Sequence, residues 1–216
     1  QSTSPYGTIV TFSESPKNAD VLYVGTDDGL IQITEDGGQN WRKVSNFPGV
    51  PDRTYVNAVF ASKHNENVVY ACFNNHKNGD FKPYVLVSMN KGNSWSPISA
   101  NLPERGSTYA IEEDHIDENL LFVGTEFGVF FSDNQGAEWK QLKGGLPTIA
   151  VRDIAIQEDH NDLVLGTFGR GFYVLDDYSS LRGIQSKLDD EATMFSIRDA
   201  LQFELSYPLG LPHKAF

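Results

Sequence analysis

The chain has little of what marks several common protein classes. Its single cysteine, Cys72, excludes an internal disulfide. No hydrophobic run approaches the roughly 18 residues of a membrane-spanning helix, so we expect no membrane insertion. The first residues, QSTSPYGT, lack the charged start and apolar core of a signal peptide. Because a processed chain would lack them too, this start does not indicate the compartment.

Positive charge is also scarce. The 216 residues include 29 acidic and 17 basic side chains, which gives a formal net charge of −12 at pH 7. The acidic excess is spread along the chain, which favours solubility and disfavours binding to a phosphate backbone. We therefore expect no nucleic-acid partner.

Helical periodicity is absent from residues 1–180, whereas apolar and aromatic residues are plentiful. Hydrophobic side chains make up 39% of the chain and aromatic side chains 12%, enough for a sizeable core in a soluble globular protein. Cys72 lies within the apolar run VVYACF, which predicts a buried structural thiol rather than a reactive one.

One polar stretch occurs three times, as TEDGGQNWRKV, SMNKGNSWSPI and SDNQGAEWKQL. All three fit one template: Ser or Thr, any residue, Asp or Asn, any residue, Gly, two free positions, Trp. The tryptophans stand at positions 41, 95 and 139, which are steps of 54 and 44 residues. The residues that fit the template are Thr34, Asp36, Gly38 and Trp41; Ser88, Asn90, Gly92 and Trp95; and Ser132, Asn134, Gly136 and Trp139.

The template predicts a structural role for these residues. An Asp or Asn side chain can accept backbone N–H groups of its own turn, and the glycine can adopt a positive φ. Each tryptophan then anchors an outer strand by burying its ring against the neighbouring sheet. The alternative is that Asp36, Asn90 and Asn134 bind a metal or take part in catalysis. Two of the three are amides and each belongs to a different repeat, so we expect no metal site and no cofactor.

The repeated stretch belongs to a longer unit of four strand-like runs. VLYVGTDDGLIQITEDGGQNWRKV aligns with LLFVGTEFGVFFSDNQGAEWKQL; a second copy carries an insertion at residues 74–83, and a fourth keeps the strands but loses the template. One further strand-like run precedes each copy. Repeats of about 40–50 residues with four strands are typical of propeller blades. The sequence thus predicts an all-β β-propeller with about four blades of four-stranded antiparallel sheet.

The predicted blades span residues 6–54, 55–107, 108–150 and 151–185, and residues 186–216 form an exit segment toward a following domain. Closed propellers have about four to eight blades, and the fourth unit lacks a clear outer strand and a tryptophan. We therefore expect the chain to be part of a larger ring or to complete a ring with another copy.

These motifs resemble the BNR or Asp-box propellers, a superfamily that includes sialidases, xyloglucanase-type glycosidases and sortilin-type receptors. Over residues 101–183, runs such as LLFVGTEFGVFFSDNQGAEWKQL and LVLGTFGRGFYVLDDYSSLR are similar to the C-terminal part of the propeller in large exported bacterial proteins described as sortilin-like or as glycosyl hydrolases. The resemblance implies an extracytoplasmic location, that is secreted, periplasmic or at the cell surface. It also implies that the chain is a fragment of a longer propeller.

Candidate site residues gather where the second-to-third-strand turns and the links between blades share one face. A guanidinium group can bind a carboxylate bidentately, although Asp52, Glu104 and Asp153 stand beside three of the arginines and could pair with them instead. The candidate ligand-binding residues are Arg53, Arg105, Arg152, Arg170, Phe127 and Phe168, and the inserted loop adds His76, Lys77, Asp80 and Lys82.

Glycoside hydrolysis needs two carboxylates about 5 to 9.5 Å apart across the scissile bond. The candidate catalytic acids on the same face are Asp27, Asp28 and Glu126. The alternative for Asp27 and Asp28 is that they are turn residues favoured before Gly29.

The leading functional hypothesis is a non-catalytic binding or scaffolding module that recognises a protein, peptide or glycan on this face. The alternative is a glycoside hydrolase, similar to xyloglucanases or sialidases, with catalytic acids partly outside the chain. A third possibility is self-association through the exposed strand edges of an open propeller.

Overall fold

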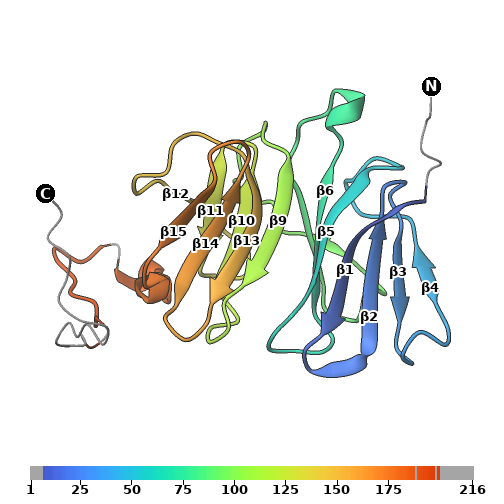
Figure 1. Ribbon diagram of the computed structural model, residues 1–216, viewed down its shortest axis with the longest axis horizontal. Helices are drawn as coiled ribbons and strands as arrows, with labels where there is room; N and C mark the ends of the chain where they lie inside the picture. Colours follow the sequence, from blue (N-terminus) through green and yellow to red (C-terminus); the bar gives the residue numbers. More distant parts are fainter. Residues whose placement is uncertain (1–6, 188, 198, 200–216) are drawn as a thin grey trace, which may run out of the picture.

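The computed structural model describes residues 7–187, 189–197 and 199, and it confirms the all-β prediction (Figure 1). Four antiparallel sheets follow one another along the chain, and in each sheet neighbouring strands are consecutive in sequence. The first sheet contains β1 (Ile9–Ser15), β2 (Asn18–Thr26), β3 (Ile31–Thr34) and β4 (Arg42–Val44). The second contains β5 (Tyr55–Ala61), β6 (Val69–Asn74), β7 (Tyr84–Ser88) and β8 (Ser96–Pro97). The third contains β9 (Thr108–Glu113), β10 (Leu121–Thr125), β11 (Gly128–Ser132) and β12 (Lys140–Leu142). The fourth contains β13 (Val151–Gln157), β14 (Asp162–Thr167) and β15 (Phe172–Leu175).

The sheets are arranged as successive blades, here numbered 1 to 4 in chain order. The first strands of neighbouring blades lie beside one another, β1 with β5, β5 with β9, and β9 with β13. Figure 1 shows the four sheets side by side, from blue β1–β4 to orange β13–β15. This is the arrangement of a partial β-propeller. Blades 1 to 3 have four strands each, whereas blade 4 has three within the described residues.

Strands in the middle of the arc are covered by a blade on each face, and burial of their apolar residues stabilises the sheets. Every residue of β6, β10 and β11 is buried, as expected for continuous apolar runs in strands covered on both sides. Three hydrophobic clusters fill the spaces between blades 1 and 2, 2 and 3, and 3 and 4. Cys72 is fully buried in the second of these spaces, and burial raises the pKa of its thiol to about 12.

The antiparallel order of the strands gives each blade two ends. The turns that follow the second strand and the links between blades lie at one end, which we call the loop face. The turns that follow the first strand and the three template turns lie at the other end, which we call the box face. None of the helices among the described residues is long and apolar enough to cross a membrane.

The three template turns, residues 34–41, 88–95 and 132–139, have the same hydrogen bonds. In the first, Asp36 Oδ1 accepts the backbone N–H of Asn40 at 2.9 Å, and Thr34 Oγ1 accepts that of Gly38 at 2.9 Å. Asn90 and Asn134 accept the equivalent N–H groups at 2.8 and 2.9 Å. Hydrogen bonds from Asn40 and Thr34 lower the pKa of Asp36 to about 2. An amide or a carboxylate serves equally well here because the essential group is an acceptor oxygen.

The glycines of these turns have positive φ, and two of them lie against the preceding blade. Gly38, Gly92 and Gly136 have φ of 91°, 76° and 84°. A Cβ on Gly136 would stand 2.9 Å from Ile98 Cβ in blade 2, whereas a Cβ on Gly38 would meet nothing nearer than Trp41, at 3.8 Å.

This difference allows backbone strain and blade packing to be measured separately. We expect Gly38→Ala to lower the free energy of unfolding by about 1–2 kcal/mol, the cost of a left-handed conformation for alanine. Gly136→Ala should cost about 1–3 kcal/mol more, because the added methyl group overpacks the space beside Ile98. Chemical denaturation of both variants measures the two values, and equal losses would show that the blade contact is not tight.

The tryptophans bury against the preceding blade, with one exception. Trp139 is 3% exposed and its indole N–H donates to the Ile98 carbonyl at 2.7 Å. Trp95 is 6% exposed, and its ring centroid lies 5.6 Å from that of Phe47. Trp41 is 43% exposed, so the prediction that it is buried is wrong. Blade 1 has no preceding blade within the described residues, so the Trp41 ring lacks the cover that Trp95 and Trp139 receive.

Polar side chains join neighbouring blades at the box face. Glu113 at the end of β9 is 1% exposed and accepts hydrogen bonds from Ser62 Oγ at 2.8 Å and from Tyr70 OH at 3.0 Å, both in blade 2. The next residue, Asp114, has a fully buried side chain that pairs with Arg182, which follows blade 4. These buried carboxylates are satisfied by partners from adjacent repeats, as burial of charge requires.

The chain leaves blade 4 through two 3-10 helices, η2 (Tyr178–Leu181) and η3 (Ile184–Lys187). Leu181 and Ile184 pack in the cluster between blades 3 and 4. Most of the predicted exit segment, residues 186–216, lies outside the described residues, and the predicted blade boundaries remain a prediction.

Candidate functional site

The first strand of every blade carries a register shift at the same place near the loop face. In each strand one residue is skipped by the pairing, and these residues are Val10, Asn57, Tyr109 and Arg152. Such bulges re-aim a side chain without ending the strand. The repeat therefore presents four different side chains from equivalent positions at the inner edge of the arc.

Three of these residues are in contact. Asn57 donates its side-chain N–H to the Tyr109 carbonyl at 2.6 Å. The guanidinium carbon of Arg152 lies 3.7 Å from the centroid of the Tyr109 ring and 5.2 Å from that of Phe168. Arg152 is thus held by two aromatic rings, an arrangement stabilised by cation–π attraction.

Glu126 completes this group, which we call the Arg152 cluster: Tyr109, Glu126, Arg152 and Phe168. Glu126 follows β10 and accepts a hydrogen bond from Tyr109 OH at 2.9 Å. Burial and the hydrogen bond to Glu126 raise the pKa of Tyr109 to about 12, although the charge of Arg152 acts in the opposite direction. Tyr109 therefore remains a neutral donor at physiological pH, and it contacts both the Glu126 carboxylate, through its hydroxyl, and Arg152, through its ring.

The Arg152 cluster is open to solvent on one side. Phe168 is 71% exposed and Arg152 is also exposed, while Tyr109 is buried beneath them. The arrangement offers an aromatic surface, the donors of a guanidinium group and an acceptor carboxylate within one patch. Such a combination can bind a polar ligand that has a flat apolar face.

The other candidate acids stabilise turns. Asp27 Oδ1 accepts the backbone N–H groups of Gly7 and Thr8 at 2.8 and 2.9 Å, and Asp28 accepts a hydrogen bond from the Thr26 hydroxyl. Both belong to the β2–β3 turn of blade 1, whereas Glu126 belongs to the β10–β11 turn of blade 3. The geometry matches the turn-forming alternative for the two aspartates.

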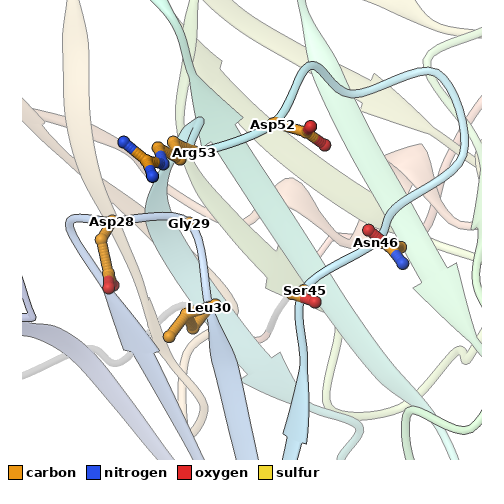
Figure 2. Close-up of a pocket in the computed structure, with 7 residues that line it drawn as sticks. All are labelled: Asp28, Gly29, Leu30, Ser45, Asn46, Asp52 and Arg53. Atoms are coloured by element: carbon orange, nitrogen blue, oxygen red, sulfur yellow. The ribbon is translucent and has the colours of Figure 1, made fainter.

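The arginines at the blade entrances do not share one site. Arg53 lines a pocket of about 450 Å³ between the turn that carries Asp28 and the link after β4 (Figure 2). Arg105 lines a separate pocket of about 640 Å³ and lies over Phe81, 5.4 Å from the ring centroid. Only Arg152 belongs to the Arg152 cluster, because it lies within β13 rather than before it.

The alternative pairing of these arginines with neighbouring acids is not observed. The ion pairs among the described residues do not include Arg53, Arg105 or Arg152. Figure 2 shows the side chains of Arg53 and Asp52 pointing in different directions. The guanidinium groups contact aromatic rings or line pockets instead.

The remaining candidates belong to the β10–β11 and β14–β15 turns and to the inserted loop of blade 2. Phe127 is 46% exposed in the β10–β11 turn, and Arg170 is exposed in the β14–β15 turn that also carries Phe168. In the inserted loop, His76 Nδ1 lies 2.7 Å from Asn74 Oδ1, and Lys77 Nζ lies 5.4 Å from the centroid of the Tyr55 ring. No group of three or more His, Cys, Asp or Glu residues within the described ranges could hold a metal ion.

Sequence reasoning missed Tyr109 and Asn57. Both stand at the start of a predicted strand, where the alternation of apolar residues assigns them to one face or the other. A bulge changes that assignment and leaves no reliable mark in a single sequence. The signal that could have found Tyr109 is its equivalence to Arg152 when the third and fourth units are aligned by their Gly-Thr strand ends; the second unit lacks Gly-Thr, so Asn57 carries no such signal.

The chain matches no known protein-family model and no curated protein. Its fold is similar to that of several solved structures. These include the GH74 enzyme of Niastella koreensis, with a TM-score of 0.61 and 14% identity; the extracellular domain of the hybrid two component system BT4673 of B. thetaiotaomicron, with 0.60 and 16%; and YCF48 bound to D1 peptide, with 0.59 and 16%.

These similarities cover 79%, 82% and 82% of this chain but 29%, 22% and 57% of the respective structures. At such low identity they establish the β-propeller fold alone. The chain spans less than two thirds of each of these proteins. Glycoside hydrolases and a peptide-binding protein both occur among the structural neighbours.

Proposed function

We propose that this chain is a non-catalytic binding module and that its ligand, a protein, peptide or glycan, binds on the loop face at the Arg152 cluster. The observation that carries the proposal is the placement of Arg152 between the rings of Tyr109 and Phe168, at 3.7 and 5.2 Å. This arrangement holds a charged donor and an exposed aromatic ring in fixed positions before any ligand arrives. Preorganisation of this kind reduces the entropy cost of binding.

The chemistry of the cluster supports a polar ligand with an aromatic, pyranose or peptide face. Phe168 supplies a flat apolar surface, Arg152 can donate two parallel hydrogen bonds to a carboxylate, and Glu126 can accept from a hydroxyl or amide. The similarity to a propeller bound to a peptide and to a GH74 enzyme is compatible with both ligand classes.

A glycoside hydrolase is the second candidate, favoured by the GH74 enzymes among the structural neighbours. On this view the catalytic acids lie partly outside the chain, because Asp27 and Asp28 form hydrogen bonds within blade 1. The sheet of blade 2 also separates these two aspartates from Glu126 of blade 3. Glu126 would be the acid contributed by this chain.

We further propose an extracytoplasmic location, as part of a longer propeller of the BNR or Asp-box type. The three template turns with their shared hydrogen bonds support this assignment, and so does the likeness to an extracellular domain. We also propose blade boundaries at residues 54, 107 and 150, a proposal supported by their position between the last strand of one sheet and the first strand of the next.

A panel of glycans and peptides tests the binding proposal. We expect a ligand found with the unchanged chain to bind at least about tenfold more weakly to Phe168→Ala and to Arg152→Ala, a loss of about 1.4 kcal/mol or more. Met89→Ala is the control, because Met89 is 60% exposed and lies in a template turn on the box face. Isothermal titration calorimetry gives the dissociation constants.

Two results would contradict the proposal. Equal affinity of all four proteins would place the ligand elsewhere on the chain. Hydrolysis of a glycan by the full-length protein, abolished by Glu126→Gln, would establish the enzymatic alternative.

A further inference from the structure

Blade 4 presents a free strand edge within the described residues. In blades 1 to 3 the third strand pairs on its outer side with β4, β8 or β12, whereas β15 is the last strand of its sheet. Phe172 and Val174 of β15 are 79% and 56% exposed. The equivalent residues in blade 2, Val85 and Val87, are buried and half-buried between blades. Phe172 and Val174 therefore face the space that a following blade would fill, while the backbone edge of β15 is available to pair with another strand.

The repeat shows what normally lies beside such an edge. In each of the first two links between blades, two apolar residues pack in the cluster that contains the tryptophan of the following blade. The first stands three positions after the tryptophan of the preceding blade, and the second stands directly before a proline. In the first link these are Val44 and Phe47, which pack in the cluster that contains Trp95. In the second they are Ile98 and Leu102, in the cluster that contains Trp139.

In the third link the same two positions have no tryptophan to receive. Leu142 and Leu146 line a cavity of about 160 Å³ together with Leu165, Tyr173 and Leu175 of blade 4. The fourth repeat lacks the template, and the three tryptophans of the chain all belong to the earlier turns. Apolar cavities of roughly 150 Å³ accept a benzene ring. The cavity is therefore the place of the missing aromatic side chain.

Among the described residues, the segment that directly follows β15 does not form this strand. It turns into η2, where Tyr178 OH and the guanidinium of Arg182 both bind Asp114 of blade 3. Leu181 then packs between blades 3 and 4. In blades 1 to 3 the fourth strand comes directly after the template turn, whereas the described residues that follow β15 leave its outer edge unpaired.

We propose that β15 and this cavity form a binding site for an extended strand of a separate polypeptide that carries a large aromatic side chain. The backbone of the strand pairs with the free edge of β15, and its aromatic ring enters the cavity between Leu142, Leu146 and Tyr173. Strand addition of this kind gains affinity from main-chain hydrogen bonds and specificity from the pocket. The two equivalent interfaces, filled by Trp95 and Trp139, define the required geometry.

A peptide from the chain itself is the probe. Residues 136–144, GAEWKQLKG, form the end of the template turn and the outer strand of blade 3, and they contain the tryptophan that fills the equivalent place. Fluorescence anisotropy of the labelled peptide measures its binding to the full chain. We expect the same peptide with the change Trp139→Ala to bind at least about tenfold more weakly.

Variants of the chain locate the site. Leu146→Lys places a charge at the cavity wall and should reduce peptide binding by a factor of about ten or more. Ile116→Lys is the control, because Ile116 is 62% exposed in the β9–β10 turn on the box face. If Leu146→Lys fails to fold, hydrogen exchange on the unchanged chain replaces it, and peptide binding should slow exchange in β15 but not in β4.

Each other outcome would overturn the proposal. Absence of binding up to about 1 mM peptide would show that the edge does not accept a strand. Equal binding of the two peptides would exclude the cavity. Binding that requires deletion of residues 200–216 would identify this chain's own tail as the occupant in place of a separate polypeptide.

Discussion

Replacement of Asp114 by alanine should lower the free energy of unfolding by about 3–5 kcal/mol, because it leaves the partly buried guanidinium of Arg182 without its carboxylate partner. The Asp114 side chain is fully buried, and its two oxygens accept hydrogen bonds from Nε and Nη2 of Arg182, both at 2.8 Å. The same carboxylate accepts from Tyr178 OH and from the backbone N–H of Asp117. Its loss removes the shared acceptor of these groups and leaves the Arg182 guanidinium with only the Asn161 side-chain oxygen at 2.6 Å, so η2 should be released from blade 3.

Asp117→Ala is the matched control for this prediction. Asp117 lies in the same turn and its carboxylate accepts from the backbone and side-chain N–H groups of Asn119, both in an exposed loop. We expect its replacement to cost about 1 kcal/mol or less. Chemical denaturation at pH 7 compares the two variants, and equal losses would show that the Asp114–Arg182 pair does not hold the end of the propeller.

The same carboxylate predicts acid sensitivity. Burial opposes ionisation of Asp114, but hydrogen bonds from Arg182 and Tyr178 outweigh burial and lower its pKa to about 2 from the usual 3.8. A carboxyl whose pKa is lower in the folded state stabilises the fold above the unfolded value and loses that contribution as the pH falls through the folded value. The contribution should therefore be complete above about pH 5 and disappear toward pH 2, and Asp114→Asn should lack this part of the acid transition.

Trp139→Ala should cost about 3–5 kcal/mol, the range for removing a buried tryptophan, while Trp41→Ala should cost about 1 kcal/mol or less. The two residues stand at equivalent positions of the repeat, but Trp139 is 3% exposed and Trp41 is 43% exposed. Trp139 also donates a hydrogen bond to Ile98 of the preceding blade. The difference between the two losses therefore measures how much the preceding blade stabilises the fold by covering the same side chain.

Thermal and chemical unfolding of both variants checks this difference. Similar losses would mean that Trp41 is covered in solution, for example by another molecule of the chain. In that case the loss for Trp41→Ala should grow with protein concentration, since association stabilises the folded state by mass action.

The propeller could be predicted because the residues that define its repeat form hydrogen bonds within their own turn. A hydroxyl, an acceptor oxygen and a glycine at fixed offsets determine a turn, as the hydrogen bonds of Asp36, Asn90 and Asn134 confirm. Strand alternation then indicates which faces are buried. The burial of Trp41 could not be predicted correctly, because it depends on a neighbour rather than on the turn itself.

The site was predicted in part. Glu126, Arg152 and Phe168 were identified from their position at turns and links, and the structure brings them together around Tyr109. Arg53 and Arg105 were grouped with Arg152 because all three recur near blade entrances, yet they line separate pockets. Contact across blades depends on the register shift in each first strand, which a single sequence does not reveal.

That register shift has an implication for how such a scaffold acquires new specificities. Val10, Asn57, Tyr109 and Arg152 are excluded from the strand pairing of their own sheets, so no pair of a ladder includes them. A variant library at Val10, Asn57 and Arg152, with the buried Tyr109 retained, would vary the side chains of three repeats while every strand pair is kept. Natural divergence can follow the same route, with ligand choice changing one residue per repeat.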